Sequence, residues 1–410
     1  MNRVVITGYG VTSPIGNTPE EFWNALENGK VGIDKITRFD ASETGITLAA
    51  EVKDFPFDKY FVKKDAKRMD LFSLYGIYAA LEAVAMSGMN LEEENMDRFG
   101  VIVGSGIGGL PVIQEQVTKL NERGPKRVAP LFVPMSIVNM VAGNIALRLG
   151  AKGICTSVVT ACASATNSIG EAFRNIKHGY SDVIVAGGSE ASICDIGIAG
   201  FASLTALTNS TDPLRASIPF DKDRSGFVMG EGAGVFVLES LEHALARGAN
   251  ILGEVVGYGA NCDAYHMTSP TPDGAGAARA MELAIEEAGI TPSQVGYINA
   301  HGTSTQANEK GESQAIETVF GLDENVLVSS TKSLTGHLLG AAGGIEAIAT
   351  LEALNHQFVP ATMGTAELGE DININVVTQT GKKHTFEYAI SNSLGFGGHN
   401  AVIALKKWSE

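Results

Sequence analysis

Short runs of β-branched residues alternate with longer amphipathic segments through the first half of the chain. Residues 4–10 (VVITGYG), 99–106 (FGVIVGSG) and 182–188 (DVIVAGG) have the length and composition of buried strands, while 74–88 and 163–179 have apolar residues at helical spacing. The 48 glycines fall mostly at strand ends, where the backbone must turn tightly. Strands that alternate with helices in this way predict an α/β fold.

A faint internal repeat divides the chain. Residues 78–109 contain a predicted helix, a strand and a glycine-rich loop, and residues 278–305 repeat that order. Residues 225–239 and 391–405 share a glycine-rich turn followed by an apolar strand. The prediction is two similar halves, 1–250 and 251–410, with insertions in the first half at 110–150 and 192–230.

The composition is that of a globular protein, with 19% charged and 44% apolar residues among 410. A predicted strand begins directly after MNR, so we expect no secretory signal. Charged residues interrupt every apolar stretch before ~18 residues, the length that a membrane span needs. We therefore expect a soluble, cytoplasmic protein with no membrane partner.

The net charge of −16 at pH 7 argues against a nucleic-acid partner, because phosphate binding needs a basic surface. One basic cluster interrupts this acidic background and consists of Lys63, Lys64, Lys67 and Arg68. A solvated helix face is one explanation for it, and a docking surface for an acidic partner is the other.

The four cysteines, Cys155, Cys162, Cys194 and Cys262, form no C-x-x-C pair. In a cytosolic chain this spacing argues against disulfides and against a zinc site, so two or three of them are expected to be small buried residues. Cys162 differs from the others because a predicted strand, 156–160, precedes it and a helix with small side chains follows it.

Cys162 has the surroundings of a nucleophile. The positive end of the helix dipole favours a thiolate, so we expect its pKa to lie below ~8.5. Small neighbours such as Ala161 and Ala163 leave room for a substrate, and the free backbone N–H groups of the helix start can hold an oxyanion. From this stretch alone, an inert buried cysteine remains the alternative.

Two histidines favour the catalytic alternative. His301 follows an apolar strand within NAHGTST, and His337 lies near the start of a Gly/Ala-rich helix, with Lys332 before it and Glu346 after it. Such element ends often carry catalytic groups. A cysteine with two histidines and no metal-ligand spacing points to covalent catalysis on a carbonyl compound, with two neutral imidazoles available to stabilise an enolate. A hydrolase needs only one histidine with an orienting partner.

A second glycine-rich motif, GSGIGG at 104–109, fits the pattern of dinucleotide-binding loops and follows a predicted strand. The segment after it offers no strand that ends in an acidic residue, so a tight strand–helix turn is favoured over a nucleotide site.

Four motifs in order resemble those of the elongating β-ketoacyl-acyl-carrier-protein synthases of type II. They are TACAS around Cys162, NAHGTST around His301, KSLTGHLLGAAG around Lys332 and His337, and NSLGFGGHN at 392–400, and the resemblance covers essentially the whole chain. The resemblance implies a thiolase-like fold, with two βαβαβαββ halves in a five-layer α/β/α/β/α sandwich, and a homodimer. The internal repeat agrees with this.

The resemblance also implies a decarboxylative Claisen condensation in fatty acid elongation. The cysteine takes an acyl chain from acyl carrier protein as a thioester, and the enolate of a decarboxylated malonyl-carrier protein attacks it. The implied roles are acylation of Cys162, enolate stabilisation by His301 and His337, an electrostatic role for Lys332, support from Glu346, an oxyanion hole at the N–H groups of Cys162 and Phe396, and a gate at Phe396.

Acyl carrier protein is strongly acidic, so the resemblance gives the basic cluster a docking role, shared with Arg123, Lys126 and Arg127. No cofactor is implied, because phosphopantetheine arrives on the carrier protein. Substrate binding is implied for Thr303 and Thr305 at the phosphopantetheine arm, for Ile107, Phe132 and Phe201 in the acyl pocket, and for His266, whose loop could line a pocket. Asn299, Glu346, Ser391 and Asn392 match positions that can hold a structural monovalent cation; no catalytic metal is implied.

Two residues depart from the pattern of many members: Leu394 stands in place of a phenylalanine and Glu309 in place of an aspartate. The first bears on gating, and neither is a reacting group. A ketosynthase of polyketide metabolism would share every catalytic residue. The alternative from another class is a non-catalytic scaffold that binds acyl carrier proteins.

Overall fold

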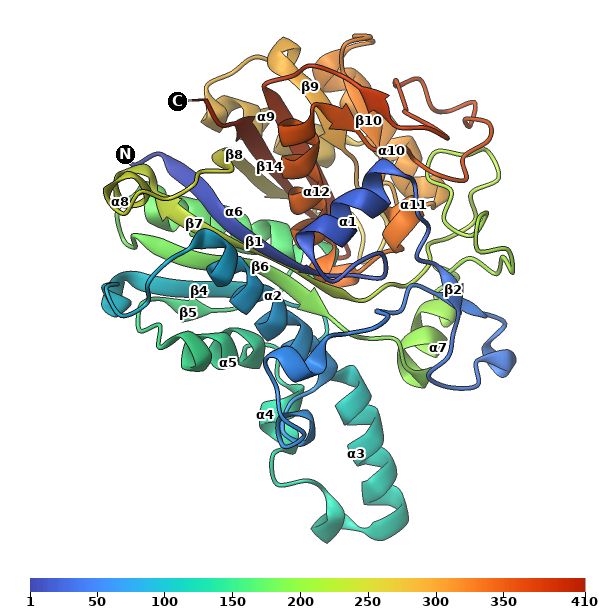
Figure 1. Cartoon of the computed structure of the whole chain (residues 1–410). Helices are drawn as coiled ribbons and strands as arrows, with labels where there is room; N and C mark the ends of the chain where they lie inside the picture. Colours follow the sequence, from blue (N-terminus) through green and yellow to red (C-terminus); the bar gives the residue numbers. More distant parts are fainter. Residues whose placement is uncertain (410) are drawn as a thin grey trace.

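The computed structural model describes residues 1–409, and strands alternate with helices through two successive halves (Figure 1). The first half contains β1 (Val4–Thr12), α1 (Pro19–Glu27), α2 (Leu71–Ser87), β4 (Phe99–Gly104), α3 (Leu110–Arg123), α4 (Phe132–Ser136), α5 (Met140–Leu149), β5 (Cys155–Thr156), α6 (Ser164–Lys177), β6 (Val183–Glu190), α7 (Asp195–Ser203), β7 (Gly232–Ser240) and α8 (Leu241–Ala246). The second half contains β8 (Gly253–Cys262), α9 (Ala275–Ala288), β9 (Val295–Asn299), α10 (Gln306–Phe320), β10 (Leu327–Ser329), α11 (Lys332–Thr335), α12 (Ala342–His356), β13 (Tyr388–Gly395) and β14 (His399–Lys407). Two small antiparallel sheets pair β2 (Asp34–Lys35) with β3 (Leu48–Ala49) and β11 (Phe358–Val359) with β12 (Lys382–Lys383).

The two halves have the same topology. In the first half the strands lie in the order β5-β4-β6-β7-β1, and in the second the order β10-β9-β13-β14-β8 repeats it strand for strand. In both halves the first two pairings are parallel and the last two antiparallel. A short pairing of β1 with β8 joins the two parts into one ten-stranded sheet.

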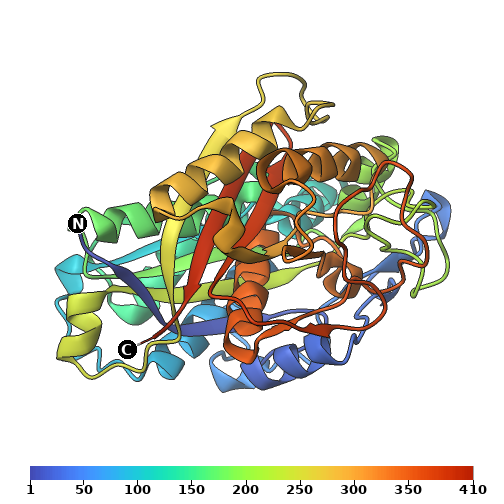
Figure 2. The same cartoon turned by 90° about the horizontal axis from the view of Figure 1, so that it is seen from above.

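Helices form the remaining layers (Figure 2). The helices α2 and α5 cover the outer side of the first five strands, and α9 and α10 cover the outer side of the second five. Between them lie α6 and α12, which contact each other and strands of both halves. Every residue of α12 from Ala342 to Leu354 is buried, as expected of a helix enclosed on all sides. The predicted thiolase-like, five-layer α/β fold is confirmed.

The tripeptide GYG occurs in β1 and again at the equivalent place in β8. A Cβ atom at Gly10 would lie 1.9 Å from the carbonyl oxygen of Ala79 in α2, and one at Gly259 would lie 1.9 Å from the carbonyl oxygen of Ala280 in α9. In each half the outer helix therefore packs directly on the backbone of the first strand, which leaves no room for a side chain.

The predicted strand at 156–160 is wrong beyond its first residue, because β5 ends at Thr156. After it, the backbone is held by side chains in place of a strand ladder. The Ser157 hydroxyl donates to the carbonyl oxygen of Val103 (2.7 Å), and the N–H of Thr160 donates to the Ser164 hydroxyl (2.9 Å).

The expected insertions in the first half are present. Segment 110–150 adds α3 and α4, which protrude from the body (Figure 1), and segment 192–230 holds α7. A third long connection, 13–70 between β1 and α2, has no equivalent in the second half and was not expected from the sequence pattern. Among residues 1–409, no helix is long and apolar enough to cross a bilayer.

We expect Gly259→Ala to destabilise the fold by about 2–3 kcal/mol, because the new methyl group would overlap the backbone of α9. Gly143→Ala in α5 is the matched control, since its Cβ would meet only one sulfur atom at 3.8 Å. The control should leave stability unchanged or raise it by up to about 1 kcal/mol. Thermal unfolding followed by circular dichroism compares them, and equal melting temperatures would contradict the packing argument.

Candidate active site

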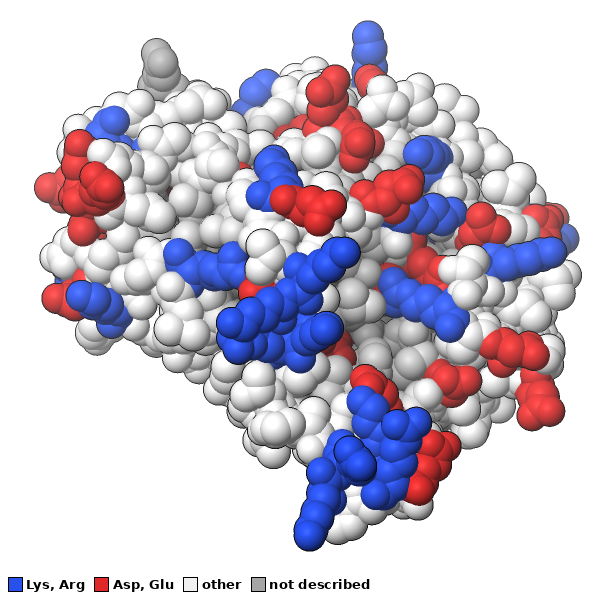
Figure 3. Space-filling view, turned by 60° about the horizontal axis from the view of Figure 1, so that its bottom comes forward, with Lys and Arg blue, Asp and Glu red and all other residues white. Residues whose placement is uncertain are grey.

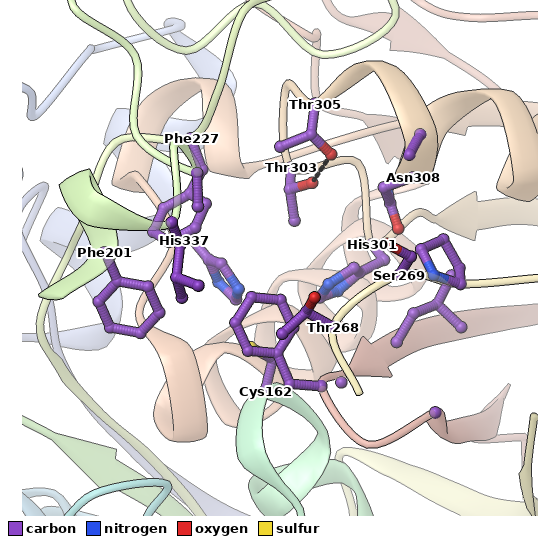
Figure 4. A pocket seen from close by; sticks show the side chains of 18 of the residues that line it. Cys162, Phe201, Phe227, Thr268, Ser269, His301, Thr303, Thr305, Asn308 and His337 are labelled. Atoms are coloured by element: carbon purple, nitrogen blue, oxygen red, sulfur yellow. Dashed lines mark hydrogen bonds between the residues drawn. The ribbon is translucent and has the colours of Figure 1, made fainter. Parts of the chain in front are cut away.

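A cavity of about 260 Å³ lies where the two halves meet, and its walls come from both of them (Figure 4). The segment before α6 supplies Cys162, the loop after β9 supplies His301, and the loop after α11 supplies His337. The turn between β13 and β14 supplies Phe396. Cys162 thus faces one space with residues that follow it by about 140 to 230 positions in the sequence.

Cys162 lies on a strained turn that we call the elbow, residues 160–162. Ala161 has a φ of 49°, which is unusual for a residue with a side chain, and Cys162 is the centre of a 3₁₀ turn (Ala161–Ala163) that leads into α6. The Ser164 hydroxyl holds the turn by accepting from the N–H of Thr160 (2.9 Å) and donating to the carbonyl oxygen of Ala161 (2.7 Å). The elbow directs the sulfur into the cavity, although only 8% of the residue is exposed.

The expected lowering of the Cys162 pKa is wrong. Burial raises the pKa of this thiol to about 12, and the opposing effects of Lys332 and of the Phe396 N–H are smaller. Desolvation disfavours the thiolate more than the 3₁₀ turn and helix start favour it. The resting cysteine is therefore a neutral thiol at pH 7.

His301 is fixed from two sides. Its own N–H and that of Gly302 donate to the carboxylate of Glu312, at 2.7 and 2.8 Å. The ammonium group of Lys332 lies 3.4 Å from Nδ1 of His301, and because an ammonium only donates, Nε2 of the ring carries the proton. Burial, assisted by Lys332, lowers the pKa of His301 well below its ordinary value, so the ring is neutral.

His337 completes the pair. Its ring lies 5.3 Å from that of His301, nearly perpendicular, and packs edge-on against Phe227 at 5.1 Å. Burial and then Lys332 lower the pKa of His337 well below its ordinary value. Two neutral imidazoles thus face the cavity beside one thiol (Figure 4).

Lys332 and Glu346 form an ion pair within the core, where each side chain is 1% exposed. The ammonium group of this pair adds to the effect of burial, which is the main cause of the lowered pKa of both histidines. Breaking one partner would leave an unpaired buried charge, which is strongly destabilising.

The remaining predicted substrate residues fall into two groups. Thr303 and Thr305 line the cavity, with their hydroxyls 2.9 Å apart, and Phe201 lines it with its ring 6.3 Å from that of Phe396. Ile107 is not in the cavity wall but packs in the same apolar cluster as Cys162.

Besides Ile107, two further predicted residues do not line the cavity. Phe132 lies on α4, away from the cavity of this chain. His266 is exposed, and its Nδ1 accepts from the N–H groups of Thr268 and Ser269, at 3.1 Å each. His266 therefore shapes the loop whose Thr268 and Ser269 line the cavity, and does not line it itself.

The pairing of that loop with the turn after β13 is not visible in the sequence. The N–H of Asp263 donates to the carbonyl oxygen of Gly398 (2.9 Å), and the N–H of Gly397 donates to that of Met267 (2.8 Å). Asn400 donates to the Asp263 carboxylate at 2.6 Å. The NSLGFGGHN motif marks one of the two segments, but no sequence signal pairs it with the other.

Four buried oxygen atoms near the ion pair have no hydrogen-bond partner within residues 1–409. They are Oδ1 of Asn299, Oε2 of Glu346, Oγ of Ser391 and Oδ1 of Asn392. Unpaired buried acceptors are costly, and an all-oxygen set of this kind suits a hard cation. The residues therefore fit the group that the sequence resemblance implies.

Comparisons with known proteins agree with this geometry. The chain matches the family models "Beta-ketoacyl synthase, N-terminal domain" over residues 1–244 and "Beta-ketoacyl synthase, C-terminal domain" over residues 252–366. It is 50% identical over 411 residues to the 3-oxoacyl-[acyl-carrier-protein] synthase 2 of Vibrio harveyi, which covers 100% of this chain and 99% of that protein. The protein of the same name from Synechocystis sp. is 49% identical over 408 residues, 99% of this chain and 98% of that one.

The chain belongs to the β-ketoacyl synthase family. A solved structure described as a type II PKS acyl-carrier protein in complex with its ketosynthase bound to the hexaketide has the same fold, with a TM-score of 0.92, 32% identity and 100% of both chains covered.

In this member of the β-ketoacyl synthase family, seven basic side chains lie on the face that carries α3 and the segment before α2 (Figure 3). None of them forms an ion pair with an acidic side chain of the described chain. We call this set the basic surface: Lys63, Lys64, Lys67, Arg68, Arg123, Lys126 and Arg127, all exposed.

We expect the alkylation of Cys162 by iodoacetamide to accelerate about tenfold per pH unit from pH 6 to 9, with no plateau. The reason is that the reactive thiolate stays a minor species throughout this range when the pKa is raised to about 12. Peptide mass spectrometry separates Cys162 from the exposed Cys155 and Cys262. A plateau with a midpoint below pH 8 would mean that the thiol is activated in the resting protein.

Proposed function

We propose that this chain is a 3-oxoacyl-acyl-carrier-protein synthase that elongates fatty acyl chains by decarboxylative condensation. The observation that supports it most directly is the meeting of one thiol and two neutral imidazoles in a single buried cavity. Relatives named 3-oxoacyl-[acyl-carrier-protein] synthase 2 match over nearly the full length at 49–50% identity. This identity is higher than the 32% shared with the hexaketide-bound ketosynthase, which favours fatty acid over polyketide substrates.

In the first stage, Cys162 attacks the thioester carbonyl of an acyl-carrier protein. The N–H groups of Cys162 and Phe396 receive the negative charge that develops on the carbonyl oxygen. The carrier arm leaves as its thiol and takes up the proton lost by Cys162, so a thioester replaces a thioester. Because the thiol starts neutral, deprotonation accompanies attack and does not precede it.

In the second stage, malonyl-carrier protein loses CO2 while His301 and His337 donate their Nε2 protons as hydrogen bonds to the thioester oxygen. Neutral imidazoles suit this task because they stabilise the enolate without transferring a full proton. The enolate carbon then attacks the Cys162 thioester, and the released thiolate of Cys162 is reprotonated. Thr303 and Thr305 bind the phosphopantetheine arm, and Phe396 separates the acyl and malonyl sites.

The partner is an acyl carrier protein, bound at the basic surface. Seven exposed and unpaired cations on a chain of net charge −16 attract an acidic protein to one face. That protein brings the phosphopantetheine arm, so no organic cofactor is required. Because its substrates are acyl- and malonyl-carrier proteins, we propose that the enzyme acts in the cytoplasm.

A homodimer is proposed because β5 is an unpaired sheet edge flanked by exposed apolar residues, Ile154 and Val159. In such a dimer Phe132, near the exposed Val133, is available to the partner's acyl pocket. Sedimentation velocity tests it, and a monomer at micromolar concentration would exclude it.

A monovalent cation is proposed between Asn299, Glu346, Ser391 and Asn392, with a structural role only. It would satisfy four buried acceptors beside the Lys332–Glu346 pair. Equal melting temperatures in sodium, potassium and choline chloride would argue against it.

Cys162→Ala should reduce condensation by at least about 10³-fold, because the acyl-enzyme cannot form. The same variant should still release CO2 from malonyl-carrier protein, since both histidines remain. Radiolabelled CO2 release and product mass spectrometry measure the two steps separately. Retained condensation would refute the nucleophile, and a wild-type chain that gains no acyl adduct would favour a non-catalytic scaffold.

Charge reversal of Lys67 and Arg68 to Glu should raise KM for carrier-bound substrates by about 5–10-fold with little change in kcat, because the contacts are distant from the chemistry. The matched control reverses the exposed pair Lys382 and Lys383, which lies on β12. Steady-state kinetics at low salt give both constants. An unchanged KM, or an equal rise in the control, would contradict docking at this surface.

A further inference from the structure

A buried carboxylate at the end of β6 takes no part in the steps above. Glu190 is 0% exposed and no basic side chain of residues 1–409 pairs with it. Its charge is instead met by five donors: the hydroxyls of Ser105 (2.9 Å) and Ser192 (3.3 Å) and the N–H groups of Gly106 (2.8 Å), Ile107 (3.2 Å) and Gly340 (3.1 Å).

Apart from Ser192, which follows β6 itself, these donors belong to two turns from different halves of the chain. One turn follows β4 and carries Ile107, and the other is the 3₁₀ turn Leu339–Ala341 between His337 and α12. The side chains of Ile107 and Leu339 both pack in the apolar cluster that contains Cys162. Glu190 thus fixes the backbone at Ile107 and next to Leu339, two side chains of the apolar cluster that contains the reactive thiol.

The internal symmetry of the fold relates the contact between Glu190 and Gly340 to the elbow that carries Cys162. The turn before α12 is equivalent to the elbow before α6, and Leu339 has a φ of 50° where Ala161 has 49°. Gly340 therefore stands where the first elbow has Cys162. Cys162 of the first elbow lines the cavity, whereas the N–H of Gly340 in the second elbow, residues 338–340, donates to a carboxylate oxygen of Glu190. The chain's own carboxylate fills the oxyanion position of the second elbow.

The cavity of about 260 Å³ reaches Cys162 from the side of Thr303 and Phe396, and neither Ile107 nor Leu339 lines it. A chain that leaves the sulfur on the side of these two residues must therefore displace one of them. We call the side chains of Ile107 and Leu339 the wall. How far the wall can move depends on whether the backbone that carries it is held in place.

We propose that Glu190 is a positioning residue that sets the chain-length discrimination at Cys162, by holding the backbone of Ile107 and Leu339 against the thiol. The inference rests on the proposed function in that the natural chain is an acyl chain. The wall itself is a property of the folded protein and is measured without any carrier protein.

The test compares the reaction of Cys162 with methyl and octyl methanethiosulfonate. The thiol forms a mixed disulfide with the alkylthio group and methanesulfinate leaves, and peptide mass spectrometry gives the rate at Cys162. In E190Q the ratio of octyl to methyl rate constants should rise by at least about threefold, because an amide cannot accept from all five donors and the wall loosens. E254Q is the matched control, since Glu254 is also a buried carboxylate but lies at the opposite end of β8 from Cys262.

A double-variant cycle separates positioning from general destabilisation. Ile107→Ala should raise the ratio alone but add less than about twofold in the E190Q background, because Glu190 acts through that wall. A ratio that changes less than about threefold in E190Q, a parallel change in E254Q, or additive effects would overturn the proposal.

If E190Q does not fold, Ser105→Ala replaces it, because it keeps the carboxylate and removes one donor. It should raise the ratio by at least about 1.5-fold, and an unchanged ratio would overturn the proposal. A failure of condensation in the unsubstituted chain bears on the proposed function and leaves this measurement unaffected.

Discussion

Direct contact between the backbones of α12, β7 and α6 is the constraint on which the rest of the molecule depends. A Cβ at Gly344 would lie 2.4 Å from the carbonyl oxygen of Gly234 in β7, and one at Gly343 would lie 2.9 Å from the backbone nitrogen of Thr166 in α6. Because α12 has no side chain at these two positions, the two halves meet closely enough for the start of α6 and the start of α12 to share one cavity. The thiol and the second histidine are brought together by glycine packing well away from the reacting atoms.

The same close packing determines the electrostatics of the site. Water is excluded, so desolvation keeps the thiol and both imidazoles neutral. A reaction that forms and consumes an enolate benefits from this, because neutral donors are worth more in a dry site than in water. The buried ion pair of Lys332 with Glu346 places the positive charge of the lysine beside the histidines. Chemistry and fold stability therefore rely on the same pair.

The sequence was sufficient for the fold class and for bringing Cys162, His301 and His337 to one cavity, because both leave local signals. The alternation of strands and helices, and the glycine-rich settings of His301 and His337, are visible without coordinates. The prediction of a strand at 156–160 was wrong because hydroxyl groups hold this backbone. Hydrophobic periodicity does not reveal hydrogen bonds of this kind. The prediction of a lowered pKa for Cys162 was wrong for a related reason. A helix start is a local feature of the sequence, whereas burial depends on the packing of the whole molecule.

The duplicated topology explains why much of the site could not be predicted from local sequence patterns. Each half contains the same elbow before its central helix, yet only one elbow carries a cysteine, and the other carries Gly340. A second open elbow would leave a buried N–H without a partner, which is costly in a core. Glu190 removes that cost and at the same time ties the second half to the turn that carries Ile107. A repeat that keeps its geometry but loses its chemistry in one copy thus becomes a support for the active copy.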